Sequence, residues 1–236
     1  MIILAIIGFT IAWVYYGTIN RSADPRVKPA QIMYGRYNVY IAENNPTKVL
    51  ELLDSIQDVY LAIAHYRNSY EMGVVLNNRA SVFLTLALND TVNEERRQLH
   101  FLLAKKYLEQ SIDYYTGWID KFGNKDAGEV FDIVHDSFTN DSLLKNNKYL
   151  DAIINNRVKE IASAQAETPR RLSVSYANMG IIHRHQNQLD EAVSYYVKAL
   201  DLWSENLAAK NNLNVLLGEP IEKQSFFRKL FPPDKN

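Results

Sequence analysis

Few residues of this chain could carry out chemistry, and their spacing does not match that of known reactive sites. His183 and His185 stand two apart, and side chains two apart on a helix point in different directions, so they do not form a metal site. The segment from Asp120 to Glu129 has Phe122 in its third place, where a calcium loop needs an oxygen ligand. None of the motifs GxSxG, HExxH, GxxxxGK[ST] or GxGxxG occurs. We therefore expect a protein that is not an enzyme, with no catalytic residue, metal or cofactor.

The composition narrows the class of protein. The 236 residues are 47% hydrophobic, which suits one folded domain with an ample core. The chain has 26 Lys and Arg against 27 Asp and Glu, so it lacks the basic excess that holds a nucleic-acid backbone, and we expect no nucleic-acid partner. Cysteine is absent, which excludes disulfide bonds, thiolate zinc sites and a cysteine nucleophile. The 9 glycines and 7 prolines are few, which favours long helices joined by short turns.

One stretch, Ser173 to Asn206, has the pattern of a complete helix-turn-helix repeat. Small residues stand where the two helices must touch, at Gly180, Ala192 and Ala199, and bulky residues surround them, at Tyr176, Met179, Tyr196 and Leu200. This stretch resembles a tetratricopeptide repeat, a helical unit of 34 residues. The resemblance implies an all-α fold, a TPR-like α-solenoid of antiparallel helix pairs.

The same small-residue spacing recurs upstream in a diverged form. Ala80 stands where Gly180 stands one hundred residues later, and Ala104, Leu108 and Ser111 match the spacing of Ala192, Tyr196 and Ala199. Residues 124–168 lack these small residues and fit either a degenerate repeat or an insertion packed across the array. Thr168 and Pro169 are expected to open the helix that leads into the clear repeat. The apolar period predicts a helical domain over 30–218, with helices near 30–44, 46–63, 70–88, 94–122, 126–138 and 143–166 and a capping helix at 207–217.

The amino-terminal residues 1–19 have the pattern of a single-pass transmembrane helix. They carry no charged side chain and span close to a hydrocarbon core of about 30 Å. A polar linker with two prolines, residues 20–29, follows. The cations Arg21, Arg26 and Lys28 come after the span and favour a cytoplasmic helical domain. A signal peptide or a buried core helix is the alternative interpretation of the apolar run. Because only three cations and a marginal span indicate the orientation, the periplasmic or extracellular side also stays an alternative.

The tetratricopeptide resemblance also implies a binding surface, because the first helix of each pair in that family lines a concave face. The residues it places there are Asn178, Ile181, Arg184 and His185 of the clear repeat, Asn211 and Asn212 of the capping helix, and Asn78 and Arg79 upstream. Asparagine can bond both donors and acceptors of an extended backbone, and Arg184 can hold a carboxylate with two N–H groups. Alternatively, these asparagines are solvated or bond within the repeat.

Three functions fit these features. The first is a non-enzymatic, membrane-tethered adaptor that binds a protein or peptide partner through the concave face. The second is a structural subunit of a membrane complex, with its 15 tyrosines buried at permanent contacts. The third is an exported periplasmic module for envelope assembly or for presenting a solute to a transporter. The tail, 219–236, is expected either to cap exposed apolar surface or to touch the membrane with its apolar side chains.

Overall fold

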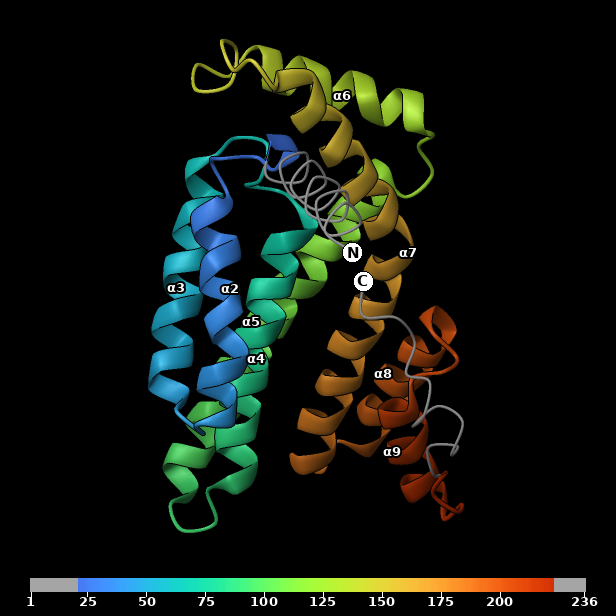
Figure 1. Ribbon diagram of the computed structural model, residues 1–236. Coiled ribbons are helices and arrows are strands. Elements are labelled where there is room, and N and C mark those ends of the chain that lie inside the picture. The colour runs from blue at the N-terminus through green and yellow to red at the C-terminus, as the bar shows by residue number, and fades with distance from the viewer. Residues whose placement is uncertain (1–20, 223–236) are drawn as a thin grey trace, which may run out of the picture. The chain divides into compact units, whose positions relative to one another are not determined.

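The structure is a computed structural model that describes residues 21–222, and every regular element in that range is an α-helix (Figure 1). The helices are α2 (Lys28–Ala42), α3 (Pro46–Ala62), α4 (Tyr70–Asn89), α5 (Glu94–Phe122), α6 (Ala127–Thr139), α7 (Leu150–His185), α8 (Leu189–Leu202) and α9 (Leu207–Leu217). The all-α prediction is therefore confirmed for the described residues. The predicted transmembrane helix at 1–19 lies outside them, as does most of the tail. Within 21–222, no helix has the combination of length and apolar character that crossing a bilayer requires.

The chain folds into two compact units, and each unit is assembled from two separate stretches. The first unit takes in the residues up to Val75 and Gly117–Ala166. The second takes in Leu76–Thr116 and the residues from Glu167 onward. Most of the region predicted as either a degenerate repeat or an insertion, 124–168, therefore belongs to the first unit.

Local signals explain where the helices of the first unit begin. Asn45 caps α3 because its side chain accepts from the Lys48 N–H at 3.1 Å, and Pro46 follows at the first helical position. Asp126 and Glu129 form a capping box at the start of α6, in which each side chain bonds the backbone of the other residue. α2 and α3 lie side by side (Figure 1). The core of the unit is apolar and aromatic, and it includes Leu53, Ile56, Trp118, Phe138 and Ile154.

The segment predicted as a polar linker, 20–29, packs into the first unit from residue 21 onward. Asp24 and Val27 are only 5% and 3% exposed. Arg26 pairs with Asp24 at 2.7 Å, so these two charges neutralise each other in a buried place. Pro29 stands in the first turn of α2, where a missing N–H costs no helical hydrogen bond.

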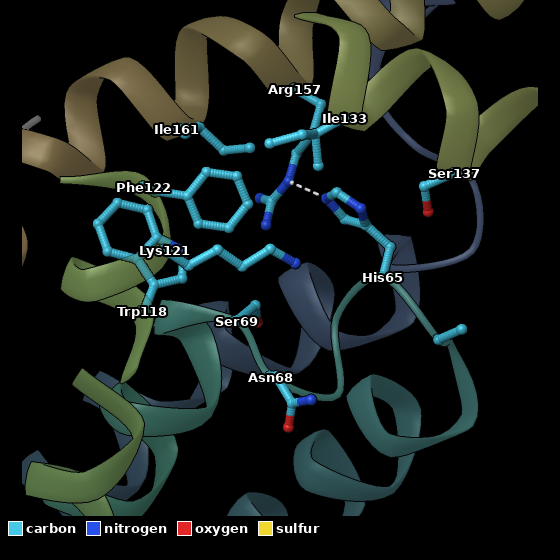
Figure 2. A pocket seen from close by; sticks show the side chains of 11 residues that line it. His65, Asn68, Ser69, Trp118, Lys121, Phe122, Ile133, Ser137, Arg157 and Ile161 are labelled. Atoms are coloured by element: carbon cyan, nitrogen blue, oxygen red, sulfur yellow. Dashed lines mark hydrogen bonds between the residues drawn. The ribbon is translucent and has the colours of Figure 1, made fainter. Parts of the chain in front are cut away.

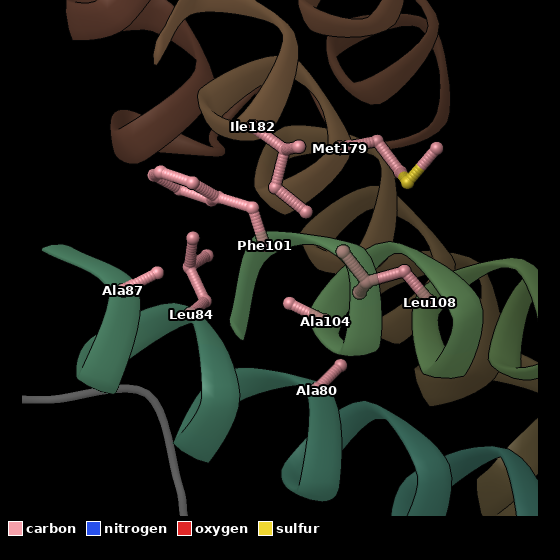
Figure 3. Packing of buried hydrophobic residues seen from close by; sticks show 8 residues of the cluster. All are labelled: Ala80, Leu84, Ala87, Phe101, Ala104, Leu108, Met179 and Ile182. Atoms are coloured by element: carbon pink, nitrogen blue, oxygen red, sulfur yellow. The ribbon is translucent and has the colours of Figure 1, made fainter. Parts of the chain in front are cut away.

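Two apolar clusters form the core of the second unit. The first joins α4, α5 and α7 (Figure 3), and its members are Ala80, Leu84, Ala87, Phe101, Ala104, Leu108, Met179 and Ile182. The second joins α7, α8 and α9, and its members are Ala177, Ala192, Tyr196, Ala199 and Ala209. Within this unit α7 therefore presents apolar side chains to the α4–α5 pair and to the α8–α9 pair.

The small residues that were expected at helix contacts are buried, which confirms their predicted packing role. Gly180 is buried, and Ala192 and Ala199 have no exposed surface. The upstream counterparts, which the sequence matched to them by spacing, also have no exposed surface: Ala80, Ala104, Leu108 and Ser111. The close helix contacts that the clear repeat predicts are therefore present in both places.

The helix that leads into the clear repeat does not begin at Pro169 as expected. α7 is one helix of 36 residues that runs through Pro169 from Leu150. Proline removes one backbone hydrogen bond, and the turns on both sides of it keep the helix continuous. The expected start near Leu143 is also wrong, because the side chains of Asp141 and Asn147 accept from nearby backbone N–H groups at 2.8 and 2.9 Å and form turns instead.

The contact between α7 and α8 predicts a large cost for one added methyl group. A Cβ at Gly180 would lie 2.7 Å from Cδ1 and 2.9 Å from Cζ of the buried Tyr196 ring. We expect Gly180→Ala to lower the free energy of unfolding by about 1 to 3 kcal/mol, measured by urea denaturation. Gly117→Ala in α5 is the matched control, since nothing lies within 4 Å of a Cβ there, and it should raise stability by about 1 kcal/mol. Equal urea midpoints for the two variants would contradict this packing.

Candidate functional site

The residues predicted for partner recognition on α7 and α9 come together in the second unit. Arg184 Nη1 donates to Asn212 Oδ1 at 2.7 Å, which joins the last turn of α7 to the middle of α9. Asn212 Nδ2 donates in turn to the carbonyl oxygen of Ala208 at 2.8 Å, so the amide is held in one orientation. Asn178 is half-buried on α7, nearly two turns before Arg184. The two first helices of the expected repeats therefore share a polar edge.

Asn211 bonds the backbone of the chain itself, and its contact with a partner stays a prediction. Its Nδ2 donates to the carbonyl oxygen of Glu222 at 2.9 Å, and its Oδ1 accepts from the Glu222 N–H at 2.8 Å. Asn214 Nδ2 donates to the carbonyl oxygen of Pro220 at 2.9 Å. Lys210 adds an ion pair to the Glu222 carboxylate at 2.6 Å. The non-helical residues 219–222 therefore lie along α9, held by its amide side chains.

Two other predicted residues have a packing role. Ile181 is partly buried and packs against both apolar clusters of the unit. His185 is exposed, and its ring stacks on Phe101 with 5.7 Å between centroids. Partial burial, then the charges of Arg184 and Arg97, lowers the pKa of His185, so the ring is neutral at pH 7.

Of the two upstream residues predicted to lie on the binding face, Asn78 and Arg79, the second points elsewhere. Asn78 is half-buried on α4, as a residue at a partly covered face would be. Arg79 is only 7% exposed, and its guanidinium lies over the Tyr107 ring of α5 at 5.0 Å. One helical step turns a side chain by about 100°, which takes Arg79 onto the α5 side of α4. Asn77, the residue before Asn78, was not singled out from the sequence, and its side chain accepts from Ser175 Oγ of α7 at 3.0 Å.

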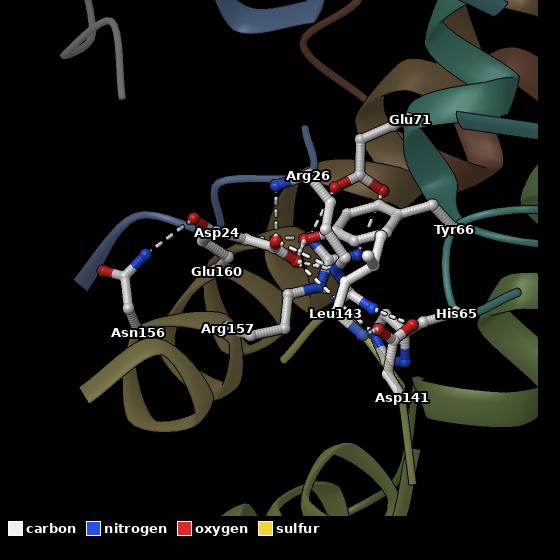
Figure 4. Close-up of polar contacts among 10 residues, drawn as sticks. All are labelled: Asp24, Arg26, His65, Tyr66, Glu71, Asp141, Leu143, Asn156, Arg157 and Glu160. Carbon is white, nitrogen blue, oxygen red and sulfur yellow. Dashed lines mark hydrogen bonds and ion pairs between the residues drawn. The ribbon is translucent and has the colours of Figure 1, made fainter. Parts of the chain in front are cut away.

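The most concentrated polar site of the first unit was not predicted, and it surrounds Arg157 (Figure 4). The Arg157 side chain is 2% exposed and bonds both carboxylate oxygens of Glu71 through Nη1 and Nη2. Nη1 also reaches Glu160 at 3.0 Å, and Nε donates to His65 Nε2 at 3.3 Å. The guanidinium carbon lies 4.3 Å from the Tyr66 ring centroid. Arg157 thus joins α7, the start of α4 and the turn before it.

The electrostatics of this cluster fix its protonation states. Burial alone would lower the pKa of Arg157, but the charge and the hydrogen bonds of Glu71 raise it well above its ordinary value. Burial, followed by the charges of Arg157, Arg26 and Lys121, lowers the pKa of His65 to about 2. A guanidinium can only donate, so His65 Nε2 must carry a lone pair and the ring is neutral. The cluster therefore holds one buried cation between two carboxylates and a neutral imidazole.

A second ion cluster of the first unit lies around Arg26 (Figure 4). Arg26 Nη1 reaches Asp141 at 2.6 Å, in addition to its contacts with Asp24. Its guanidinium carbon lies 4.5 Å from the Phe138 ring centroid, and Tyr66 donates to Asp24 Oδ2 at 3.3 Å. These contacts hold the residues before α2 against the turn after α6. Within residues 21–222, no three His, Cys, Asp or Glu side chains are grouped so that they could hold a metal ion.

The neutral His65 predicts a loss of stability in mild acid. An unfolded histidine titrates near 6.5, whereas folded His65 does not, so the unfolded state takes up an extra proton as the pH falls below 6.5. We expect the free energy of unfolding to fall by about 2 kcal/mol from this group between pH 6.5 and 5.0. His65→Gln keeps an acceptor for Arg157 without titrating, and urea denaturation should show that it lacks this part of the pH dependence. The same slope in both proteins would contradict a neutral His65.

The chain has no match among protein-family models, curated proteins or solved structures. Its function must therefore be inferred from the chemistry of its own side chains.

Proposed function

We propose that the chain is a non-enzymatic adaptor whose second unit is a tetratricopeptide-like array that binds an extended peptide segment of a protein partner. The buried small residues at both sets of repeat positions support the array. The order of packing supports it as well, because one apolar cluster links α4, α5 and α7 and the next links α7, α8 and α9. A solenoid is built from neighbour contacts of this kind.

The observation that carries the proposal is the way in which α9 holds main chain. The amide of Asn211 bonds both the N–H and the C=O of Glu222, and such a contact depends on backbone rather than on side-chain identity. Residues 219–222 thus occupy this surface as a segment of a partner would. In the proposed complex the partner segment displaces them and takes over the bonds to Asn211 and Asn214.

The charged side chains beside this surface indicate what the partner segment carries. Arg184 uses one N–H for Asn212, so its planar guanidinium keeps donors for a carboxylate. Lys210 already holds the carboxylate of Glu222. Val215 is 50% exposed on the same helix and offers an apolar contact. The preferred partner segment is therefore extended and bears at least one carboxylate.

The proposed membrane tether is residues 1–19, on the strength of their uncharged, apolar sequence. A tether would raise the local concentration of the array near membrane-bound partners. The positive charges that follow the span favour a cytoplasmic array.

The surface proposed to bind the partner, here called the partner surface, includes Arg184 of α7 and Asn211 and Asn214 of α9. Removing two of its polar side chains should weaken binding of the partner. We expect Arg184→Ala combined with Asn211→Ala to weaken partner binding by roughly 2 to 3 kcal/mol, more than tenfold. The measurement is partner recovery from detergent-solubilised native membranes, by quantitative mass spectrometry on the tagged full-length chain.

The matched control is Arg170→Ala combined with Asn155→Ala. Both residues are exposed on α7, and their side-chain contacts stay within that helix, to Glu167 and to the carbonyl oxygen of Asp151. This control double variant removes the same two side-chain types and should leave the recovery of the partner unchanged. If both double variants recovered the same partners at the same yield, the partner surface would be wrong.

A further inference from the structure

The first unit contains a pocket of about 190 Å³ whose walls come from α5, α6, α7 and the turn before α4 (Figure 2). Its apolar lining residues include Trp118, Phe122, Ile133 and Ile161. Its polar lining residues include Asn68, Ser69, Lys121 and Ser137. We propose that this pocket binds a small monocarboxylate with a flat apolar body, of the size of benzoate. This site lies outside the surface proposed for the partner peptide.

The volume sets the size of the ligand. An engineered apolar cavity of about 150 Å³ holds one benzene molecule. A pocket of about 190 Å³ therefore has room for one aromatic ring and a small head group. Trp118 and Phe122 are 2% and 4% exposed and lie at a centroid distance of 5.3 Å. Their rings give a flat ligand an aromatic surface for offset or edge contacts.

The charges that line the pocket select an anion. Lys121 and Arg157 are its charged lining residues, and none of the residues that form its walls is acidic. Arg157 is already neutralised by Glu71 and Glu160, and the nearby His65 ring is neutral. In the described part of the chain Lys121 makes no ion pair. Its ammonium lies 5.1 Å from the Phe122 ring centroid and points toward the space between His65 and Ser69 (Figure 2). Lys121 is therefore the cation that a ligand carboxylate would meet.

Ser69 gives independent support for a polar ligand group. The residue is 3% exposed, and its Oγ has no hydrogen-bond partner among the described residues. Buried hydroxyl groups are nearly always hydrogen-bonded, so an unpartnered one that lines a pocket indicates a group that is bound there. A carboxylate placed beside Lys121 can accept from this hydroxyl with one oxygen and from the ammonium with the other.

The test is a titration of the purified full-length chain with benzoate at pH 7.5, followed by isothermal calorimetry. We expect saturable binding of one benzoate per chain. Benzyl alcohol, which has the ring without the charge, should bind at least tenfold more weakly, and inorganic phosphate, which has charge without the ring, should not saturate. The proposal is overturned if benzoate does not saturate, or if phosphate or benzyl alcohol binds as tightly as benzoate.

Two variants then locate the site. Lys121→Met keeps the length of the side chain and should weaken benzoate binding at least tenfold, so that benzoate and benzyl alcohol bind alike. Ser69→Ala should weaken benzoate binding several-fold without lowering the urea midpoint, because its hydroxyl has no hydrogen-bond partner among residues 21–222. Lys125→Met is the matched control, since Lys125 pairs with Glu129 and does not line the pocket, and it should bind benzoate normally. Unchanged benzoate affinity in Lys121→Met would overturn the site even if the chain bound benzoate.

Discussion

The buried guanidinium of Arg157 is the constraint on which the first unit depends. A charge that is 2% exposed is tolerable only where its donors are bonded, and here Glu71, Glu160 and His65 supply the acceptors. Removing one partner of such a pair typically costs about 3 to 5 kcal/mol. The first turn of α4 and the turn before it must therefore bring Glu71 and His65 to α7 in one arrangement, and the turn before α4 also carries Ser69 to the pocket.

Much of the fold could be predicted because its signals are local. Asn45, Pro46 and the Asp126–Glu129 box mark helix starts within one turn of sequence, and Gly218 ends α9 in the left-handed conformation. The start of α7 could not be predicted, because the Asx turns at Asp141 and Asn147 compete with an equally helical pattern. The helix start predicted at Pro169 was wrong because one lost hydrogen bond does not end a helix whose other turns are well packed.

The residues of the candidate sites also include some that could be predicted from the sequence and some that could not. The repeat resemblance named Arg184, Asn211 and Asn212, and their role in binding a partner stays a prediction. It also named Arg79, whose side chain lies against Tyr107 of α5. Arg157 pairs with a residue 86 positions away, and no short-range pattern reports such a contact. One signal was present: Arg157 interrupts an apolar stripe that includes Ile153 and Ile161, so a charge stands where the helical period places a core residue.

The division of the chain into units built from separate stretches has a consequence for biosynthesis. The first unit needs residues 117–166 as well as the residues up to Val75, so it cannot close while only its amino-terminal part has left the ribosome. The ion pair of Glu71 with Arg157 cannot form until α7 has emerged. The second unit likewise requires the residues from Glu167 onward. Neither unit corresponds to a single continuous fragment, so a stop codon in α6 would leave both without part of their core.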